Sequence, residues 1–74
     1  MPPYPGTDVS VRFYRKQRGL TQAELALEVG VSRQTIISIE RGDYAPSVYL
    51  ALRIARALNA QVEQLFTLTD GQQQ

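Results

Sequence analysis

Residues 20–42 read LTQAELALEVGVSRQTIISIERG, and the start and stop signals in this stretch decide the fold. Glu24 follows Thr21 by three residues, which is the spacing of a capping box, so a helix is expected to begin at Gln22. Gly30 has no Cβ and suits the left-handed conformation that ends a helix. Apolar residues between these signals recur at helical spacing and form the expected inner face: Ala23, Leu25, Ala26 and Val29.

A second helix is expected from Arg33 to about Arg41. Ser32 is its expected N-cap, because a short hydroxyl side chain accepts a hydrogen bond from the first turn. Gly42 follows as its stop signal. Two helices joined by a tight turn that contains a glycine form a helix-turn-helix, so the sequence predicts that motif here.

Three runs in and beside this stretch resemble a known family. GLTQAELA, VSRQTIISIERG and YAPS are similar to the Cro/C1-type repressors, the XRE family. Ala26, Gly30 and Ile36 resemble the small residue, the turn glycine and the buried aliphatic of the DNA-binding motif. The resemblance covers residues 9–68 and is greatest to short stand-alone regulators similar to the cytolysin repressor. It implies an all-α, compact five-helix bundle of the lambda-repressor-like type, with a short terminal β-strand.

The two ends of the chain differ in composition from the domain expected over residues 8–69. Residues 1–7 contain three prolines and a glycine and should form a flexible arm, either a disordered tail or an arm that touches DNA or a partner. Residues 70–74 end in a glutamine run and should be a disordered tail. A first helix is expected from a cap at Thr7 or Asp8 to about Arg18.

Two more helices are expected after the proline at position 46. Ser47 is the cap of a helix over residues 48–58, and Asn59 ends it. A shorter helix is expected over residues 61–66. The expected inner residues of these two helices are Val48, Ala51, Leu52, Ile54, Ala55, Leu58, Val62, Leu65 and Phe66. Residues 66–69 then alternate apolar and polar, which favours a short strand paired with the segment near Tyr4 or with a second subunit.

The helix over residues 33–41 is the expected recognition helix, since a helix this short fits the major groove and reads base edges from its N-terminal residues. Gln34 suits adenine, and Arg33 suits either guanine or a phosphate. The alternative is that this face of the helix is polar only because it faces water, which would be the better interpretation without the surrounding motif. The predicted base contacts are Arg33, Gln34, Thr35, Ile37 and Ser38.

Phosphate contacts are predicted for Gln22, Arg41 and Tyr44, with an ordinary solvated glutamine as the alternative for Gln22. A helix N-terminus favours anions, and Gln22 is the first residue of its helix. Glu40 falls on the inner side of its helix, where an unpaired carboxylate is costly, and Arg15 falls on an inner face as well. The resemblance implies that Arg15 and Glu40 form a buried structural ion pair.

Composition narrows the function of this 74-residue chain, which has the length of one domain. It has no Cys and no His, so the usual thiol nucleophile, general base and soft metal ligands are missing, and an enzyme is not expected. No cofactor, metal or small-molecule ligand is expected. The formal net charge of +1 is a weak basic bias, although Arg12, Arg15, Lys16 and Arg18 lie in one short stretch.

The location follows from missing targeting signals. The opening MPPYPG is unlike a signal peptide, and no apolar run is long enough to span a bilayer. We therefore expect a cytoplasmic, nucleoid-associated protein that makes no membrane contact.

The predicted function is sequence-specific binding of double-stranded DNA as a transcriptional repressor. One motif touches few base pairs, so a homodimer on a palindromic operator is expected. Leu65, Phe66 and Leu68 are the predicted hydrophobic centre of the dimer, unless they only close the core of one subunit. The alternatives are an antitoxin that also binds a toxin protein, and a protein-interaction module with a degenerate motif.

Overall fold

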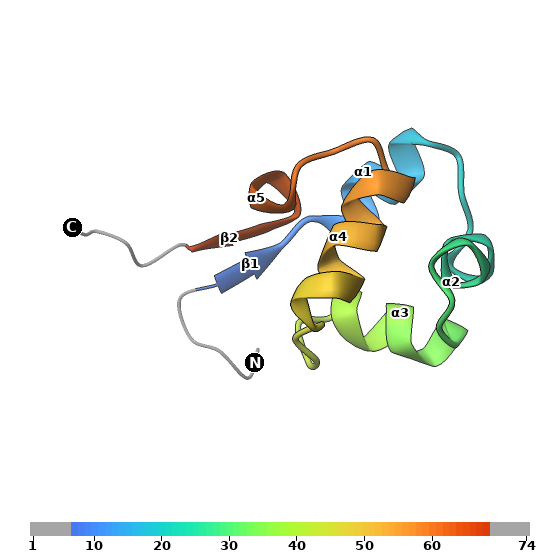
Figure 1. The fold of residues 1–74 in the computed structure, drawn as a ribbon, viewed down its shortest axis with the longest axis horizontal. Helices are drawn as coiled ribbons and strands as arrows, with labels where there is room; N and C mark the ends of the chain where they lie inside the picture. The colour runs from blue at the N-terminus through green and yellow to red at the C-terminus, as the bar shows by residue number, and fades with distance from the viewer. Residues whose placement is uncertain (1–6, 69–74) are drawn as a thin grey trace.

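Five helices and two short strands make up residues 7–68, the part of the chain that the computed structural model describes (Figure 1). In chain order the elements are β1 (Thr7–Val9), α1 (Val11–Gln17), α2 (Gln22–Val29), α3 (Arg33–Glu40), α4 (Val48–Ala57), α5 (Val62–Leu65) and β2 (Phe66–Leu68). The predicted five-helix bundle with a short terminal strand is confirmed. The helix-turn-helix lies at one end of the molecule, and the two strands lie with α5 at the other.

The helix ends follow the local signals in the sequence. Thr21 and Glu24 form both hydrogen bonds of a capping box at the start of α2. Ser32 and Ser47 each accept a hydrogen bond from the backbone N–H three residues further on. Gly30 has a φ of 79° at the end of α2, a left-handed conformation in which a Cβ is strained. These predicted caps are confirmed. They could be predicted because each depends only on residues within one helical turn.

The first helix begins later than predicted, because the predicted cap residues lie in a strand. Thr7 and Asp8 belong to β1 rather than capping α1, and Ser10 precedes the first residue of that helix. β1 pairs antiparallel with β2, with Val9 opposite Phe66. The strand predicted at residues 66–69 is therefore confirmed over 66–68, and its partner is a segment of the same chain.

The described residues test only part of what was predicted for the two ends of the chain. The arm predicted over residues 1–7 is one residue too long, since Thr7 is in β1. Residues 1–6, with Tyr4, and the tail predicted over 70–74 lie outside the described residues.

The core lies between the helices and includes residues from all five. Its buried members are Val11, Leu25, Ala26, Val29, Ile36, Ile39, Leu50, Ile54, Ala55, Leu58 and Leu65. Three predicted inner residues are wrong: Ala23 is exposed, and Val48 and Leu52 are 73% and 51% exposed. The sequence pattern missed Leu50, which is buried. α4 is apolar over more than one face, so its pattern did not show where the buried stripe ends.

The longest helix, α4, has 10 residues and is about 15 Å long at 1.5 Å per residue. A bilayer core is about 30 Å thick. Within residues 7–68, no helix has the length and apolar character needed to cross a membrane.

Candidate nucleic-acid interface

α2 and α3 are joined by residues 30–32, which set the angle between the two helices. The backbone N–H groups of Gly30 and Val31 both donate to the carbonyl oxygen of Ala26, at 2.9 and 3.0 Å. The extended backbone of Ser32 then starts α3. The inner faces of both helices contribute to one buried cluster, so the turn and the core together hold α3 in place.

The outer face of α3 carries the predicted base contacts. Arg33 and Gln34 are exposed at its N-terminal end, and Thr35, Ile37 and Ser38 are half-buried. The Thr35 hydroxyl lies 2.9 Å from that of Ser32 and takes part in the helix cap. The exposed side chains of Arg33 and Gln34 therefore have the most accessible polar groups on this face.

The loop after α3 contains two of the predicted phosphate contacts, Arg41 and Tyr44. Tyr44 is 48% exposed. Arg41 Nε lies 3.3 Å from a carboxylate oxygen of Asp43, and the two side chains are 70% and 46% exposed. Such exposed ion pairs are worth little in water, so Arg41 can leave Asp43 for a phosphate at small cost.

A bidentate ion pair joins α1 to the C-terminal end of α3. Arg15 Nε donates to Glu40 Oε2 at 2.6 Å, and Arg15 Nη2 donates to Glu40 Oε1 at 3.2 Å. The side chains are 8% and 4% exposed. This is the pair that the resemblance implies, and its burial makes the loss of either partner costly.

Gln22 is connected to this pair, which the sequence did not indicate. Its amide nitrogen Nε2 donates to Glu40 Oε1 at 3.1 Å. Gln22 is therefore neither a freely solvated residue nor an isolated phosphate ligand. The inward position of Glu40 could have indicated this bond. A carboxylate that accepts two hydrogen bonds from Arg15 still has lone pairs for another donor.

Two other arginines hold helix ends, which the sequence reasoning also missed. Arg53 of α4 donates from Nε to the Val29 carbonyl oxygen at 3.2 Å, at the end of α2. Arg18 donates to the carbonyl oxygen of Ala57 at the end of α4. Cations are favourable at helix C-termini, where carbonyl groups lack helical partners.

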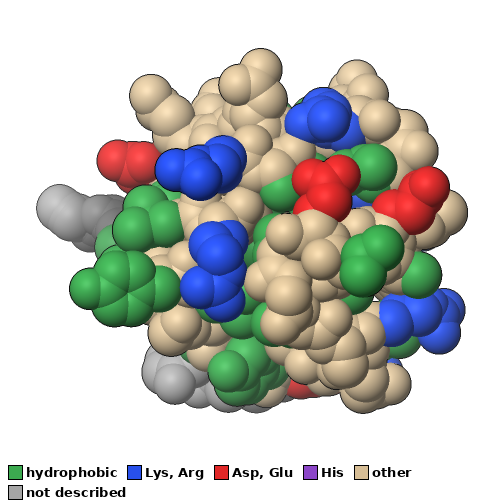
Figure 2. All heavy atoms as spheres, turned by 45° about the vertical axis from the view of Figure 1, so that its right-hand side comes forward, with side chains coloured by type: hydrophobic (Ala, Val, Ile, Leu, Met, Phe, Trp, Pro, Cys, Tyr) green, Lys and Arg blue, Asp and Glu red, His purple; other side chains and the backbone are tan. Residues whose placement is uncertain are grey.

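The predicted basic stretch in α1 does not form one charged face, since Arg15 is buried while Arg12 and Lys16 are exposed. On the side of the molecule shown in Figure 2, basic, acidic and hydrophobic side chains are interspersed. Among the described residues, the face shown in Figure 2 therefore carries no continuous basic patch.

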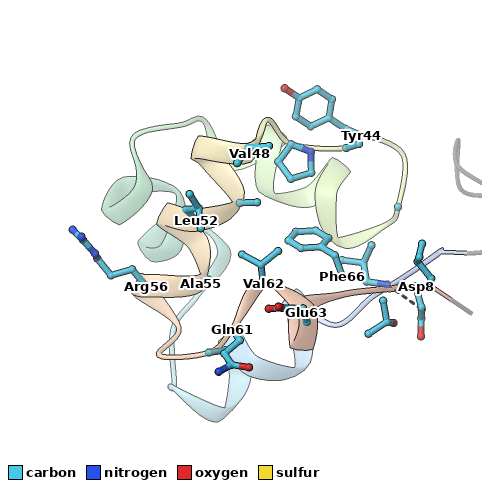
Figure 3. Close-up of a pocket in the computed structure, with 18 residues that line it drawn as sticks. Asp8, Tyr44, Val48, Leu52, Ala55, Arg56, Gln61, Val62, Glu63 and Phe66 are labelled. Atoms are coloured by element: carbon cyan, nitrogen blue, oxygen red, sulfur yellow. Dashed lines mark hydrogen bonds between the residues drawn. The ribbon is translucent and has the colours of Figure 1, made fainter.

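A groove of about 970 Å³ lies away from the outer face of α3, between α4, α5 and the strands (Figure 3). Its apolar lining includes Val48, Leu52, Ala55, Val62, Phe66 and Leu68. Asp8, Arg56 and Glu63 are the charged residues around it. Tyr44, from the loop after α3, lies at one edge.

The three predicted dimer residues have different surroundings. Leu65 has no exposed surface and belongs to the subunit core, so its assignment as a dimer contact is wrong. Leu65 packs inward because it ends α5 on the side that faces the core cluster. Phe66 is half-buried in the groove, and Leu68 is 78% exposed.

Comparison with known proteins agrees with this geometry. A family model described as helix-turn-helix matches residues 11–65. An uncharacterized HTH-type transcriptional regulator of Methanothermobacter thermautotrophicus is 56% identical over 61 residues, which cover 81% of this chain and 88% of that protein.

Two solved structures have the same fold. The restriction-modification controller protein C.AhdI of Aeromonas hydrophila has a TM-score of 0.68 and 31% identity, over 73% of this chain and 82% of that one. SinR of Bacillus subtilis, a master regulator for biofilm formation solved in complex with DNA, has a TM-score of 0.66 and 31% identity, over 72% and 86%. These relatives are non-enzymatic regulators, in agreement with the prediction that this protein is not an enzyme. The chain belongs to the Cro/C1-type (XRE) helix-turn-helix family and is a DNA-binding transcriptional regulator.

Proposed function

We propose that this protein is a repressor that binds a palindromic operator as a homodimer, with α3 in the major groove. The observation that carries the proposal is the N-terminal end of α3, where Arg33 and Gln34 are exposed on a helix whose inner face is fully buried. A rigid helix with a free polar end suits base reading, because each base contact requires a defined distance and angle.

The half-buried residues of α3 complete the proposed base contacts. The methyl group of Thr35 and the side chain of Ile37 offer apolar surface to a thymine methyl, while the Ser38 hydroxyl can bond either a donor or an acceptor. Arg33 pairs with guanine or grips a phosphate, and Gln34 pairs with adenine.

The proposed phosphate contacts flank α3. Gln22 lies at the N-terminus of α2, where backbone N–H groups lack helical partners. Arg41 and Tyr44 follow α3 and are exposed. Contacts from both sides fix the position of α3 on the duplex without reading sequence.

The proposed dimer contact is the groove between α4, α5 and the strands. Phe66 lines it and Leu68 is exposed beside it, together with Val48 and Leu52. A two-fold contact here buries these side chains against the same residues of a second copy. Two recognition helices about 34 Å apart then meet successive major grooves on one side of the DNA.

Repression follows from occupancy, because a dimer over two half-sites covers DNA that a polymerase needs. An antitoxin role is the second candidate, since the same apolar groove also offers a surface to a toxin protein. The two differ in what fills the groove: a second copy of this chain or a different protein.

Selection of bound duplexes from a random DNA pool tests the proposal. A recovered palindrome, with half-site centres about 10 base pairs apart, is the expected result. The affinity for that duplex should fall steeply with salt, in proportion to the number of phosphates contacted. Recovery of no preferred sequence, or of a single unpaired half-site, contradicts the proposal.

A further inference from the structure

The buried ion pair belongs to a larger bonded cluster that joins four segments. Arg15 Nη1 donates to the carbonyl oxygen of Leu20 at 2.8 Å, in the loop that leads into α2. Glu40 accepts from Arg15 of α1 and from Gln22, the first residue of α2. We call Arg15, the Leu20 carbonyl, Gln22 and Glu40 the Arg15 cluster. It connects α1, the loop before α2 and the first residue of α2 with the C-terminal end of α3.

The carboxylate determines which way the Gln22 amide faces. An ionised carboxylate only accepts hydrogen bonds, so the amide nitrogen of Gln22 has to face Glu40. This bond uses one of the two amide hydrogens and leaves the other. The backbone N–H of Gln22 has no helical partner either, because Gln22 begins α2. Two N–H donors of one residue are thus available to an anion.

The bond to Glu40 also removes rotational freedom before DNA binds. A glutamine side chain that is not held has several rotamers and loses that freedom when it grips a phosphate. Gln22 is half-buried and already bonded, so it has less freedom to lose. Binding sites gain affinity when their groups are held in the bound geometry beforehand.

We propose that Glu40 is a positioning residue for DNA binding, which holds Gln22 at the place a backbone phosphate occupies while α3 reads the bases. This rests on the proposed function. Arg15 acts one step further away: it orients the Glu40 carboxylate and fixes the Leu20 carbonyl ahead of α2. The cluster therefore sets the position of the phosphate contact relative to the recognition helix.

Replacing both Arg15 and Glu40 by methionine separates the proposed positioning role from the contribution of the ion pair to stability. Replacing a buried ion pair by apolar residues of similar size often preserves or raises stability. The double variant Arg15→Met with Glu40→Met keeps the packing but leaves Gln22 without its acceptor. If the pair only stabilises the fold, the folded double variant binds DNA as tightly as the wild type. If Glu40 positions Gln22, the folded double variant binds about tenfold more weakly.

The experiment is a cycle of four proteins titrated against the selected operator duplex: wild type, Gln22→Ala, the Met/Met variant and the triple variant. Circular dichroism melts confirm that each is folded at the temperature of the titration. We expect Gln22→Ala to weaken binding about tenfold and to reduce the salt slope by about one. The triple variant should be no weaker than Gln22→Ala, because Glu40 acts through Gln22.

Gln17→Ala is the matched control and should keep the affinity of the wild type. Gln17 is exposed at the C-terminal end of α1, where the helix dipole disfavours a phosphate. If the Met/Met variant does not fold, the cycle is run with Arg15→Leu and Glu40→Leu, a second apolar pair that also removes the acceptor of Gln22.

Wild-type affinity of the folded Met/Met variant overturns the inference, as do additive losses in the triple variant. A wild type that prefers no DNA sequence overturns the proposed function instead.

Discussion

The helix-turn-helix and the strand end of this protein are built in opposite ways. In α2 and α3, polar side chains near the helix ends are paired: Thr21 with Glu24, Ser32 with Thr35, and Gln22 with Glu40. Around the strands, large apolar side chains stay in solvent, with Val48 73% and Leu68 78% exposed. The first region exposes one large apolar side chain, Leu27, whereas the second exposes several that line one groove and are available to a partner.

In the first region, the largest loss of stability is expected from substitution in the buried ion pair. Arg15→Ala leaves the Glu40 carboxylate buried without its counter-charge, and should cost about 3–5 kcal/mol of unfolding free energy. Thermal and urea melts measure this loss. Arg12→Ala, an exposed neighbour in α1, should change stability by less than about 0.5 kcal/mol. Equal, small effects of both substitutions would mean that the Arg15 pair contributes no more than a surface charge.

At the strand end, a substitution should weaken dimer formation rather than the stability of the fold. Leu68→Asp places a carboxylate in each half of the proposed two-fold contact, and should weaken the dimer at least about a hundredfold, or about 2.7 kcal/mol. Sedimentation equilibrium at micromolar concentration measures the change. Leu27→Asp is the control, since Leu27 is 84% exposed on α2, away from the groove.

Two results would count against that interface. A wild type that stays monomeric with and without DNA refutes the homodimer. A Leu68→Asp variant that stays fully dimeric places the contact elsewhere.

The outer face of α3 should respond in binding and not in stability. Gln34 is exposed and the described side chains make no hydrogen bond to it. Gln34→Ala should therefore weaken operator binding by about 1–3 kcal/mol and relax the preference at one base. Titration against the selected duplex tests this, with circular dichroism to verify the fold. Unchanged specific affinity would remove Gln34 from the recognition surface.

The smallest expected effect lies in the loop between the two regions. Asp43 pairs with Arg41 and adds a negative charge near the proposed path of the DNA backbone. Asp43→Asn should strengthen DNA binding by up to about 1 kcal/mol, because Arg41 is then free for a phosphate. Salt-dependent titrations measure the gain, which should shrink in an Arg41→Ala background. No gain at low salt would show that this loop lies away from the DNA.

The two regions also differed in how far they could be predicted. Both ends of α2 were predicted from Thr21, Glu24 and Gly30, because these signals act within one turn of the helix. The outward position of Gln34 followed from helical periodicity, and the inward position of Glu40 followed in the same way. The candidate site was therefore predictable as a set of positions.

The errors concentrate where distant segments meet. Leu52 has the same apolar character as the buried Leu50, and only the position of α4 against the core puts the one outside and the other inside. Leu65 was assigned to a dimer because nothing local shows whether a subunit has already buried it. The bond from Gln22 to Glu40 depends on the packing of α2 against α3.

Local signals specify the helix-turn-helix: the caps, the left-handed turn at Gly30 and the helical period each act over a few residues and leave the backbone few alternatives. The strand at residues 7–9, in contrast, depends on packing between distant segments. Their extended backbone becomes favourable when Val9 lies opposite Phe66, since strand hydrogen bonds require a partner from elsewhere in the chain. For the same reason, only the packed fold shows how Glu40 holds Gln22.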